Sequence, residues 1–251
     1  PDEVEAVAKA IKKCGRPILL SLSPGNKVPM DDESLDRFRM ANMLRVTHDI
    51  WDDERGIKSC FSAWKRWGGY SKPGFWIDMD MIPFGKLKLM SPPPPDKTKE
   101  EISRMRGHGF TRQSKFTKPQ MTTFITMRAL SASPLMIGGD LPTMDDFSFK
   151  LLTNKDMVAC NQNGVMGTMK YSRRGNPLST WVTPKKGVDN AGWIGVFNRS
   201  TNDTTVEASA EVLGIEEPDK RTLRDVWGEK SISVGETLEI PAQGAAFIVY
   251  E

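Results

Sequence analysis

The first two thirds of the chain alternate between helical and strand-like hydrophobic patterns. Apolar residues at 4, 7, 8 and 11 follow the i, i+3, i+4, i+7 spacing of an amphipathic helix that ends near Gly15. Short apolar runs typical of buried strands follow at residues 17–23, 43–50, 75–81 and 134–137. Strands that alternate with helices predict parallel βα units, so we expect an α/β fold in this part.

Two features interrupt or punctuate this alternation. The run Ser91-Pro-Pro-Pro-Pro95 lies in a charged tract over residues 86–118, which predicts an extended insertion. It is either a loop that shapes a substrate entrance or a surface excursion without a role at the site. Capping-box patterns at 117–120 and 143–146 predict that helices begin there.

The pattern of apolar runs changes after about residue 165. Asn163-Gly164 is a hairpin-type turn signal, and the apolar runs beyond it are short and separated by turn residues. They lie at 180–182, 193–197, 205–208, 222–226, 237–240 and 246–250. This pattern predicts an antiparallel β-sandwich. We therefore expect two domains, one over residues 1–165 and one over residues 166–251.

The composition of the chain argues against several classes of function. The net charge of +3 comes from 35 basic and 32 acidic residues that are well mixed, so neither nucleic acid nor a membrane surface is indicated as a partner. No apolar run approaches the roughly 20 residues needed to span a bilayer. The three cysteines are odd in number and widely spaced, which favours structural thiols over disulfides or a zinc site. The chain opens on Pro1, so we expect an upstream segment.

The candidate chemistry is a set of carboxylates. Two strand-like runs end in them, the first with Asp49, Asp52 and Asp53 and the second with Asp78 and Asp80. Consecutive parallel strands that present acids at their C-terminal ends are how an α/β barrel builds an acidic site. Carboxylates gathered in one pocket can cleave glycosidic bonds. Asp49 could instead cap the helix that follows it.

Four motifs in order resemble family-27 glycoside hydrolases, the group of α-galactosidases and α-N-acetylgalactosaminidases. They are the runs over residues 45–52, 74–81, 130–141 and 151–162. The resemblance implies the C-terminal half of a (β/α)8 barrel, strands 5–8, followed by the antiparallel β-sandwich. It also implies a retaining enzyme that removes terminal α-linked galactose-like sugars from an oligosaccharide or glycoside, without a metal or organic cofactor.

The resemblance assigns roles to individual residues. Asp49 would be the general acid/base, and Arg45, four residues earlier and on the same strand face, would bind a sugar hydroxyl. Asp80 would hold sugar hydroxyls and Met81 would pack beside the sugar ring. His48, on the opposite strand face, is expected to be a buried structural residue.

Two further residues receive less definite roles. Ser23 takes the place where the family reads the sugar 2-position, with space left by Gly25. Trp76 either lines the pocket or packs the barrel. In the β-domain, Trp181 and Trp193 could bind sugar, although core packing explains them more simply.

The family's covalent nucleophile belongs to a strand upstream of residue 1, so we expect this chain alone to be inactive. The alternative is a non-catalytic carbohydrate-binding protein on a degenerate glycosidase scaffold. A half-barrel would leave two open sheet edges, which predicts pairing with the missing N-terminal half or a homo-oligomer. The compartment stays open, and the resemblance favours a secreted or periplasmic protein.

Overall fold

The computed structural model describes residues 2–87, 95–104, 111–173 and 175–251. Its N-terminal part holds a parallel sheet in the order β1-β2-β3, formed by β1 (Ser21–Leu22), β2 (Met43–Arg45) and β3 (Trp76–Asp78). Helix α1 (Asp2–Cys14) precedes this sheet, and α2 (Asp32–Phe38) and α3 (Glu54–Arg66) connect its strands. Because the strands are parallel, the segments that follow β1, β2 and β3 leave the sheet at one end.

A second parallel pair continues the pattern. Strand β4 (Met81–Ile82) pairs with β7 (Met136–Ile137), and α5 (Lys118–Leu130) precedes β7 in the chain. The short η1 (Leu141–Thr143) and the helices α6 (Asp146–Leu152) and α7 (Lys155–Gln162) follow. The predicted mixture of helices and parallel strands is therefore present, whereas the half-barrel stays a prediction.

The rest of the chain is rich in antiparallel strands, as the sequence predicts. One sheet of six strands has the order β13-β12-β15-β10-β9-β8, and a two-stranded sheet pairs β11 with β14. The strands are β8 (Thr168–Ser172), β9 (Leu178–Pro184), β10 (Gly192–Asn198), β11 (Thr204–Glu207), β12 (Leu223–Asp225), β13 (Lys230–Ile232), β14 (Thr237–Ile240) and β15 (Ala245–Tyr250). Helix α8 (Ala210–Leu213) and η2 (Pro218–Lys220) lie between them. The division near residue 165 remains a prediction.

Aromatic packing joins the N-terminal part to the C-terminal sheet. The indole of Trp64 on α3 stacks on that of Trp181 on β9 with ring centroids 3.8 Å apart. The Trp64 Nε1–H donates to the Gly167 carbonyl at 2.9 Å. Trp181 and Trp193 are 4% and 5% exposed, so both belong to the core and neither offers a surface for sugar.

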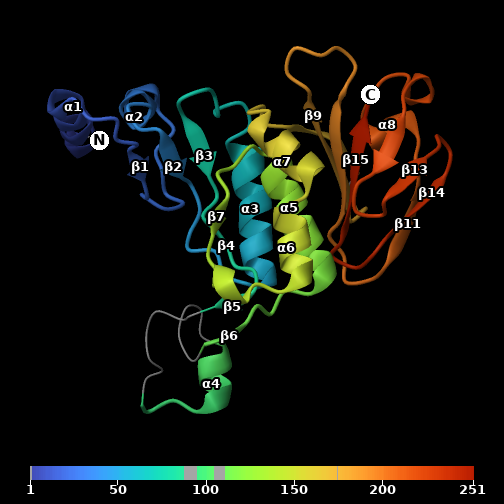
Figure 1. Cartoon of the computed structure of the whole chain (residues 1–251), viewed down its shortest axis with the longest axis horizontal. Coiled ribbons are helices and arrows are strands. Elements are labelled where there is room, and N and C mark those ends of the chain that lie inside the picture. Colours follow the sequence, from blue (N-terminus) through green and yellow to red (C-terminus); the bar gives the residue numbers. More distant parts are fainter. Residues whose placement is uncertain (1, 88–94, 105–110, 174) are drawn as a thin grey trace.

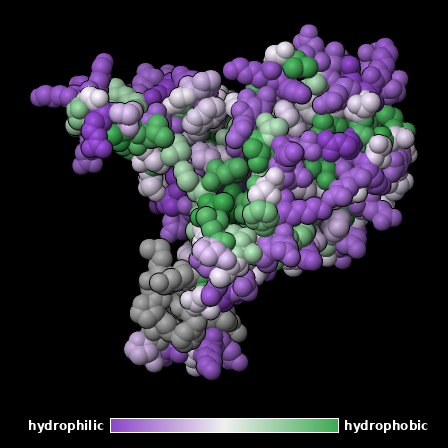
Figure 2. Space-filling model, in the orientation of Figure 1, coloured by the Kyte–Doolittle hydropathy of each residue, from purple (hydrophilic) through white to green (hydrophobic). Residues whose placement is uncertain are grey.

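The insertion forms a projection below the body of the molecule (Figure 1). Strands β5 (Lys86–Leu87) and β6 (Arg112–Gln113) pair antiparallel at its base, and α4 (Lys99–Arg104) lies farther out. The proline run occupies residues 92–95, and its first three prolines lie outside the described residues. The space-filling view shows an apolar area on the body of the molecule, above this projection (Figure 2).

The two predicted capping boxes have different outcomes. Thr117 and Gln120 form a complete capping box at the start of α5. Thr143 does not cap a helix, because its hydroxyl donates to the Asp140 carboxylate at 2.5 Å within a tight turn. Asp145 caps α6 instead, accepting from the Ser148 amide.

Candidate active site

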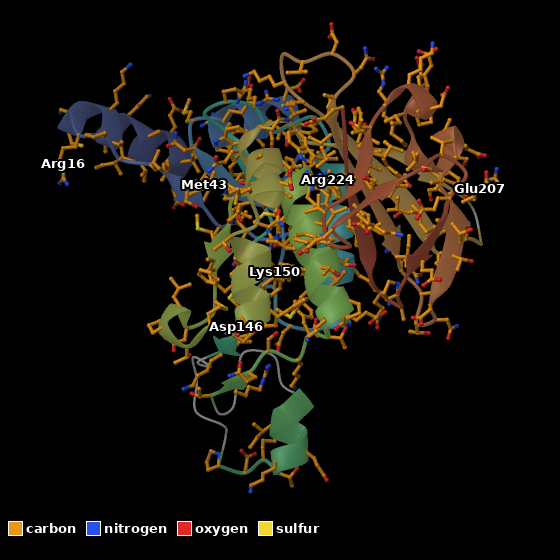
Figure 3. The ribbon with its side chains drawn as sticks, turned by 45° about the vertical axis from the view of Figure 1, so that its right-hand side comes forward. Arg16, Met43, Asp146, Lys150, Glu207 and Arg224 are labelled. Atoms are coloured by element: carbon orange, nitrogen blue, oxygen red, sulfur yellow. The ribbon has the colours of Figure 1, made fainter. Side chains whose placement is uncertain are left out.

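Asp49 lies at the rim of an open hollow beyond the carboxyl end of β2. The hollow holds about 700 Å³ of empty space and is lined by Gly25, Arg45, His48, Asp49, Trp51 and Arg55. Met43, labelled in Figure 3, marks the opposite end of this strand. Strand β2 ends at Arg45 and not near Ile50 as predicted, because the chain bends at residues 47–48.

This bend corrects the prediction for His48. Strand alternation predicts a buried residue facing away from Asp49, but alternation does not extend past Arg45. His48 is exposed and lines the same hollow as Asp49. It therefore belongs to the residues that a ligand in the hollow would meet.

Arg45 joins the two carboxylates that the sequence singles out. Its Nη2 lies 3.0 Å from Oδ1 of Asp49, and its Nη1 donates to Oδ1 of Asp80 at 3.2 Å. The Asp49 side chain is 74% exposed and that of Asp80 is 16% exposed. One arginine thus holds an exposed acid and a recessed acid at the same end of neighbouring strands.

Asp80 is fixed from several directions. Its Oδ2 accepts from the Ile50 amide at 2.6 Å, and its own amide donates to Oδ1 of Asp78 at 2.8 Å. Its φ of 72° lies in the left-handed region, which costs energy for a residue with a side chain. Asp78 therefore satisfies a backbone donor beneath Asp80.

A buried arginine outside the sequence motifs also holds the turn at Asp80. Arg128 on α5 is fully buried, and its guanidinium donates to the carbonyls of Met79 and Met81, the latter at 3.2 Å. Its Nη1 also donates to the Ser133 hydroxyl at 2.9 Å, and that hydroxyl accepts from the Met79 amide at 3.0 Å. The two residues that flank Asp80 are therefore clamped by one side chain.

Asp78 shares this buried layer. Burial raises the pKa of its carboxyl above the ordinary value, and the nearby Arg128 charge acts in the opposite direction. The Arg128 cation thus compensates part of the cost of a carboxylate that is 6% exposed.

Asp52 does not point into the hollow, although it ends the same motif. It is buried and forms a bidentate pair with Arg112 on β6, whose Nη2 donates to Oδ1 at 2.9 Å. The Lys115 amide donates to Oδ2 at 2.6 Å. Burial alone would raise the pKa of Asp52, but these donors outweigh it and the pKa is lowered. Asp52 thus anchors the base of the projection to the segment that carries Asp49.

This lowered pKa predicts acid sensitivity. The stability that Asp52 contributes is present above its unfolded pKa of about 4 and is lost as the pH falls through its lower folded pKa. Asp52→Asn should cost about 2–3 kcal/mol of unfolding free energy at pH 7, because it weakens charge-assisted hydrogen bonds. The difference from the unmutated chain should shrink below about pH 4 in urea titrations. A pH-independent difference would contradict this, and the exposed Asp36→Asn serves as control.

The other predicted site residues are placed less centrally. Ser23 is exposed just beyond β1, two residues before Gly25 of the hollow. Met81 packs over Gly138, where an added Cβ would lie 2.5 Å from the methionine sulfur. Trp76 starts β3, and its ring approaches Gly164. The structure does not bring Trp76 to the hollow.

The described residues contain no group of three or more His, Cys, Asp or Glu side chains placed to hold a metal ion. In the same part of the chain, no helix has the length and apolarity needed to cross a bilayer.

Comparison with known proteins supports the family resemblance. Residues 175–250 match the alpha galactosidase C-terminal beta sandwich domain. The chain is 27% identical to alpha-galactosidase 2 of Arabidopsis thaliana, covering 90% of this chain and 49% of that protein. It is 28% identical to an alpha-galactosidase of Cyamopsis tetragonoloba, covering 91% and 48% respectively.

A solved structure extends this likeness to three dimensions. The GH27 β-L-arabinopyranosidase of Geobacillus stearothermophilus is 30% identical, with a TM-score of 0.82 over all of this chain and 53% of that one. These likenesses support an α-galactosidase-like protein that is similar to glycoside hydrolase family 27 over its C-terminal region. The chain spans about half the length of the curated relatives that it matches.

Proposed function

We propose that these residues form part of a retaining glycosidase that removes terminal α-linked galactose-like sugars. The observation that carries the proposal is the Arg45-centred pair of carboxylates, one exposed and one recessed, at the ends of adjacent parallel strands. Relatives named as α-galactosidases and a β-L-arabinopyranosidase support the same class of substrate. β-L-Arabinopyranose has the ring configuration of α-D-galactose without its hydroxymethyl group, so one pocket can accept both.

The proposed division of labour follows from exposure. Asp49 reaches solvent and would protonate the leaving glycosidic oxygen, then remove a proton from the attacking water. Asp80 is recessed and would accept hydrogen bonds from sugar hydroxyls. Its two oxygens have about four acceptor sites, and Arg45 and the Ile50 amide use two of them.

Retention needs a second carboxylate about 5–5.5 Å from the acid/base. We propose that it comes from polypeptide outside these 251 residues, because the curated relatives are about twice as long. The chain alone would then be inactive. Residues 1–165 would be strands 5–8 of a (β/α)8 barrel, and residues 166–251 would be the β-sandwich domain.

Exposed apolar side chains mark where the rest of the barrel would attach. Ile18 and Leu19 beside β1 are 42% and 75% exposed, and Met136 and Ile137 on β7 are 42% and 40% exposed. Unpaired strands with apolar residues favour association. The missing half would cover both edges, and in its absence a second copy of the chain would compete for them.

The test has two stages. The intact mass of the natural protein should be well above the 28.1 kDa of these residues. That form should hydrolyse 4-nitrophenyl α-D-galactopyranoside or β-L-arabinopyranoside, but not the β-D-galactopyranoside. Sugar binding without turnover of any of these compounds would favour the non-catalytic alternative.

Asp80→Asn tests the sugar-binding role. It should weaken binding of free D-galactose by roughly tenfold or more, because charge-assisted hydrogen bonds to hydroxyls become neutral ones. Isothermal titration of the full-size protein measures the change. Asp36→Asn, in an exposed pair with Arg39, should leave binding unchanged. Equal affinity in Asp80→Asn would contradict the assigned role.

A further inference from the structure

Arg55 occupies an electrostatically unfavourable position. It is the second residue of α3, where the helix dipole favours anions and disfavours cations. The residues beside it follow the preference, since Asp53 caps the helix and Glu54 opens it. The helix dipole therefore does not explain why an arginine stands in this first turn. Its side chain lines the hollow that holds Asp49.

The carboxylates near Arg55 in sequence are engaged elsewhere. Asp52 is paired with Arg112, Asp53 accepts from the Gly56 amide at 2.7 Å, and Glu54 lies 2.7 Å from Lys58 Nζ. Asp49, in the same hollow, is paired with Arg45. Within the described residues Arg55 forms no ion pair, so its charge remains available to a ligand.

The position of Arg55 relative to Asp49 indicates which part of a ligand it would meet. If Asp49 protonates the leaving oxygen, the residues around it on the solvent side contact the leaving group. In the hollow these residues are the exposed His48 and Arg55 and the half-buried Trp51. The side chains of Arg45 and Asp80 are only 21% and 16% exposed. An indole offers a flat apolar surface to a sugar ring or an aryl group. A guanidinium offers a planar pair of donors that matches a carboxylate.

We propose that the leaving-group side of the hollow recognises a carboxylate, so that the substrate carries its terminal galactose-like sugar on an acidic residue such as a uronic acid. Arg55 binds the carboxylate, and Trp51 supports the ring that bears it. This inference rests on the proposed function, because the direction of the substrate is set by the role of Asp49.

The experiment compares two probes of nearly equal size, 4-carboxyphenyl and 4-carbamoylphenyl α-D-galactopyranoside. Their binding to the 251-residue chain is followed by isothermal titration at low ionic strength. The acidic probe should bind roughly tenfold tighter than the neutral one, the factor expected for one partly exposed charge-assisted contact. Added salt should reduce this preference, because exposed charges are screened.

Arg55→Gln should remove the preference and leave the affinity for the neutral probe unchanged. Arg16→Gln is the matched control, since Arg16 is exposed at the outer end of the molecule (Figure 3), and it should keep the preference. Equal binding of both probes to the unmutated chain would overturn this inference alone. Binding of neither probe would also overturn this inference alone, because the proposed function places part of the site in polypeptide outside these 251 residues. A preference that survives in Arg55→Gln would also overturn the role of Arg55.

Discussion

Replacing Asp49 with Asn will lower kcat of the full-size protein on an alkyl α-galactoside by about 10²–10⁴-fold, the range of general acid–base catalysis. The cause is the loss of the proton donor, since an amide cannot protonate a departing alkoxide. Free galactose should bind as before, because the recessed Asp80 remains in place. Initial rates and a galactose titration on one preparation measure both effects.

The leaving group provides an internal test of this result. A 2,4-dinitrophenyl leaving group departs without protonation, so its release in the first step should be much less affected by Asp49→Asn. Stability should hardly change, because an exposed pair such as Arg45–Asp49 contributes about 0–1 kcal/mol. Asp36→Asn is the control, since Asp36 is also 74% exposed in a pair with arginine. Unchanged turnover of the alkyl substrate would exclude Asp49 as the acid/base.

Replacing Arg128 with Met will reduce the free energy of unfolding by about 3–5 kcal/mol, the usual cost of removing one partner from a buried charged network. The carbonyls of Met79 and Met81 and the hydroxyl of Ser133 would each lose a donor in the protein interior. Arg128→Lys should recover only part of the loss, because one ammonium cannot match the geometry of the guanidinium. Urea unfolding measures the difference.

The pH dependence of stability distinguishes the electrostatic role of Arg128 from a role in packing alone. Burial already raises the pKa of Asp78, and removing the Arg128 charge should raise it further. A carboxyl with a raised pKa in the folded state binds protons more tightly there, so stability falls as the pH rises above the unfolded value of about 4. Arg128→Met should steepen this fall and extend it to higher pH.

Arg66 provides the matched comparison for Arg128. It also donates to a carbonyl, that of Val28 at 3.3 Å, but it is exposed. Arg66→Met should therefore cost less than about 1 kcal/mol and leave the pH profile unchanged. Equal losses in the two variants would show that burial of the Arg128 charge is not the cause.

The sequence predicts the elements that depend on local patterns. The amphipathic spacing locates α1, the Thr117–Gln120 capping box locates the start of α5, and alternation locates the antiparallel strands. The sequence also predicts that Arg45 and Asp49 lie close together, but it does so through strand alternation, which is not the cause of the contact. Strand periodicity does not reach Asp49, and the contact is made across a bend.

What the sequence does not predict depends on contacts between distant segments. The spacing of Asp52 places it in the same motif as Asp49, but Arg112, sixty positions away, holds it in a buried pair. Arg128 lies in a helix whose sequence pattern predicts apolar core. Its contact with the backbone beside Asp80 arises only from the fold. His48 is exposed because of the same bend that ends β2.

The stack of Trp64 on Trp181 limits how this protein can be recombined with its relatives. Half of the stacked pair belongs to a helix of the N-terminal part and half to a strand of the C-terminal sheet. A chimera that takes the sheet from a relative would set a foreign side chain against Trp64. The helix α3 surface and the β9 surface must therefore be inherited together, as one module that crosses the boundary between the two parts.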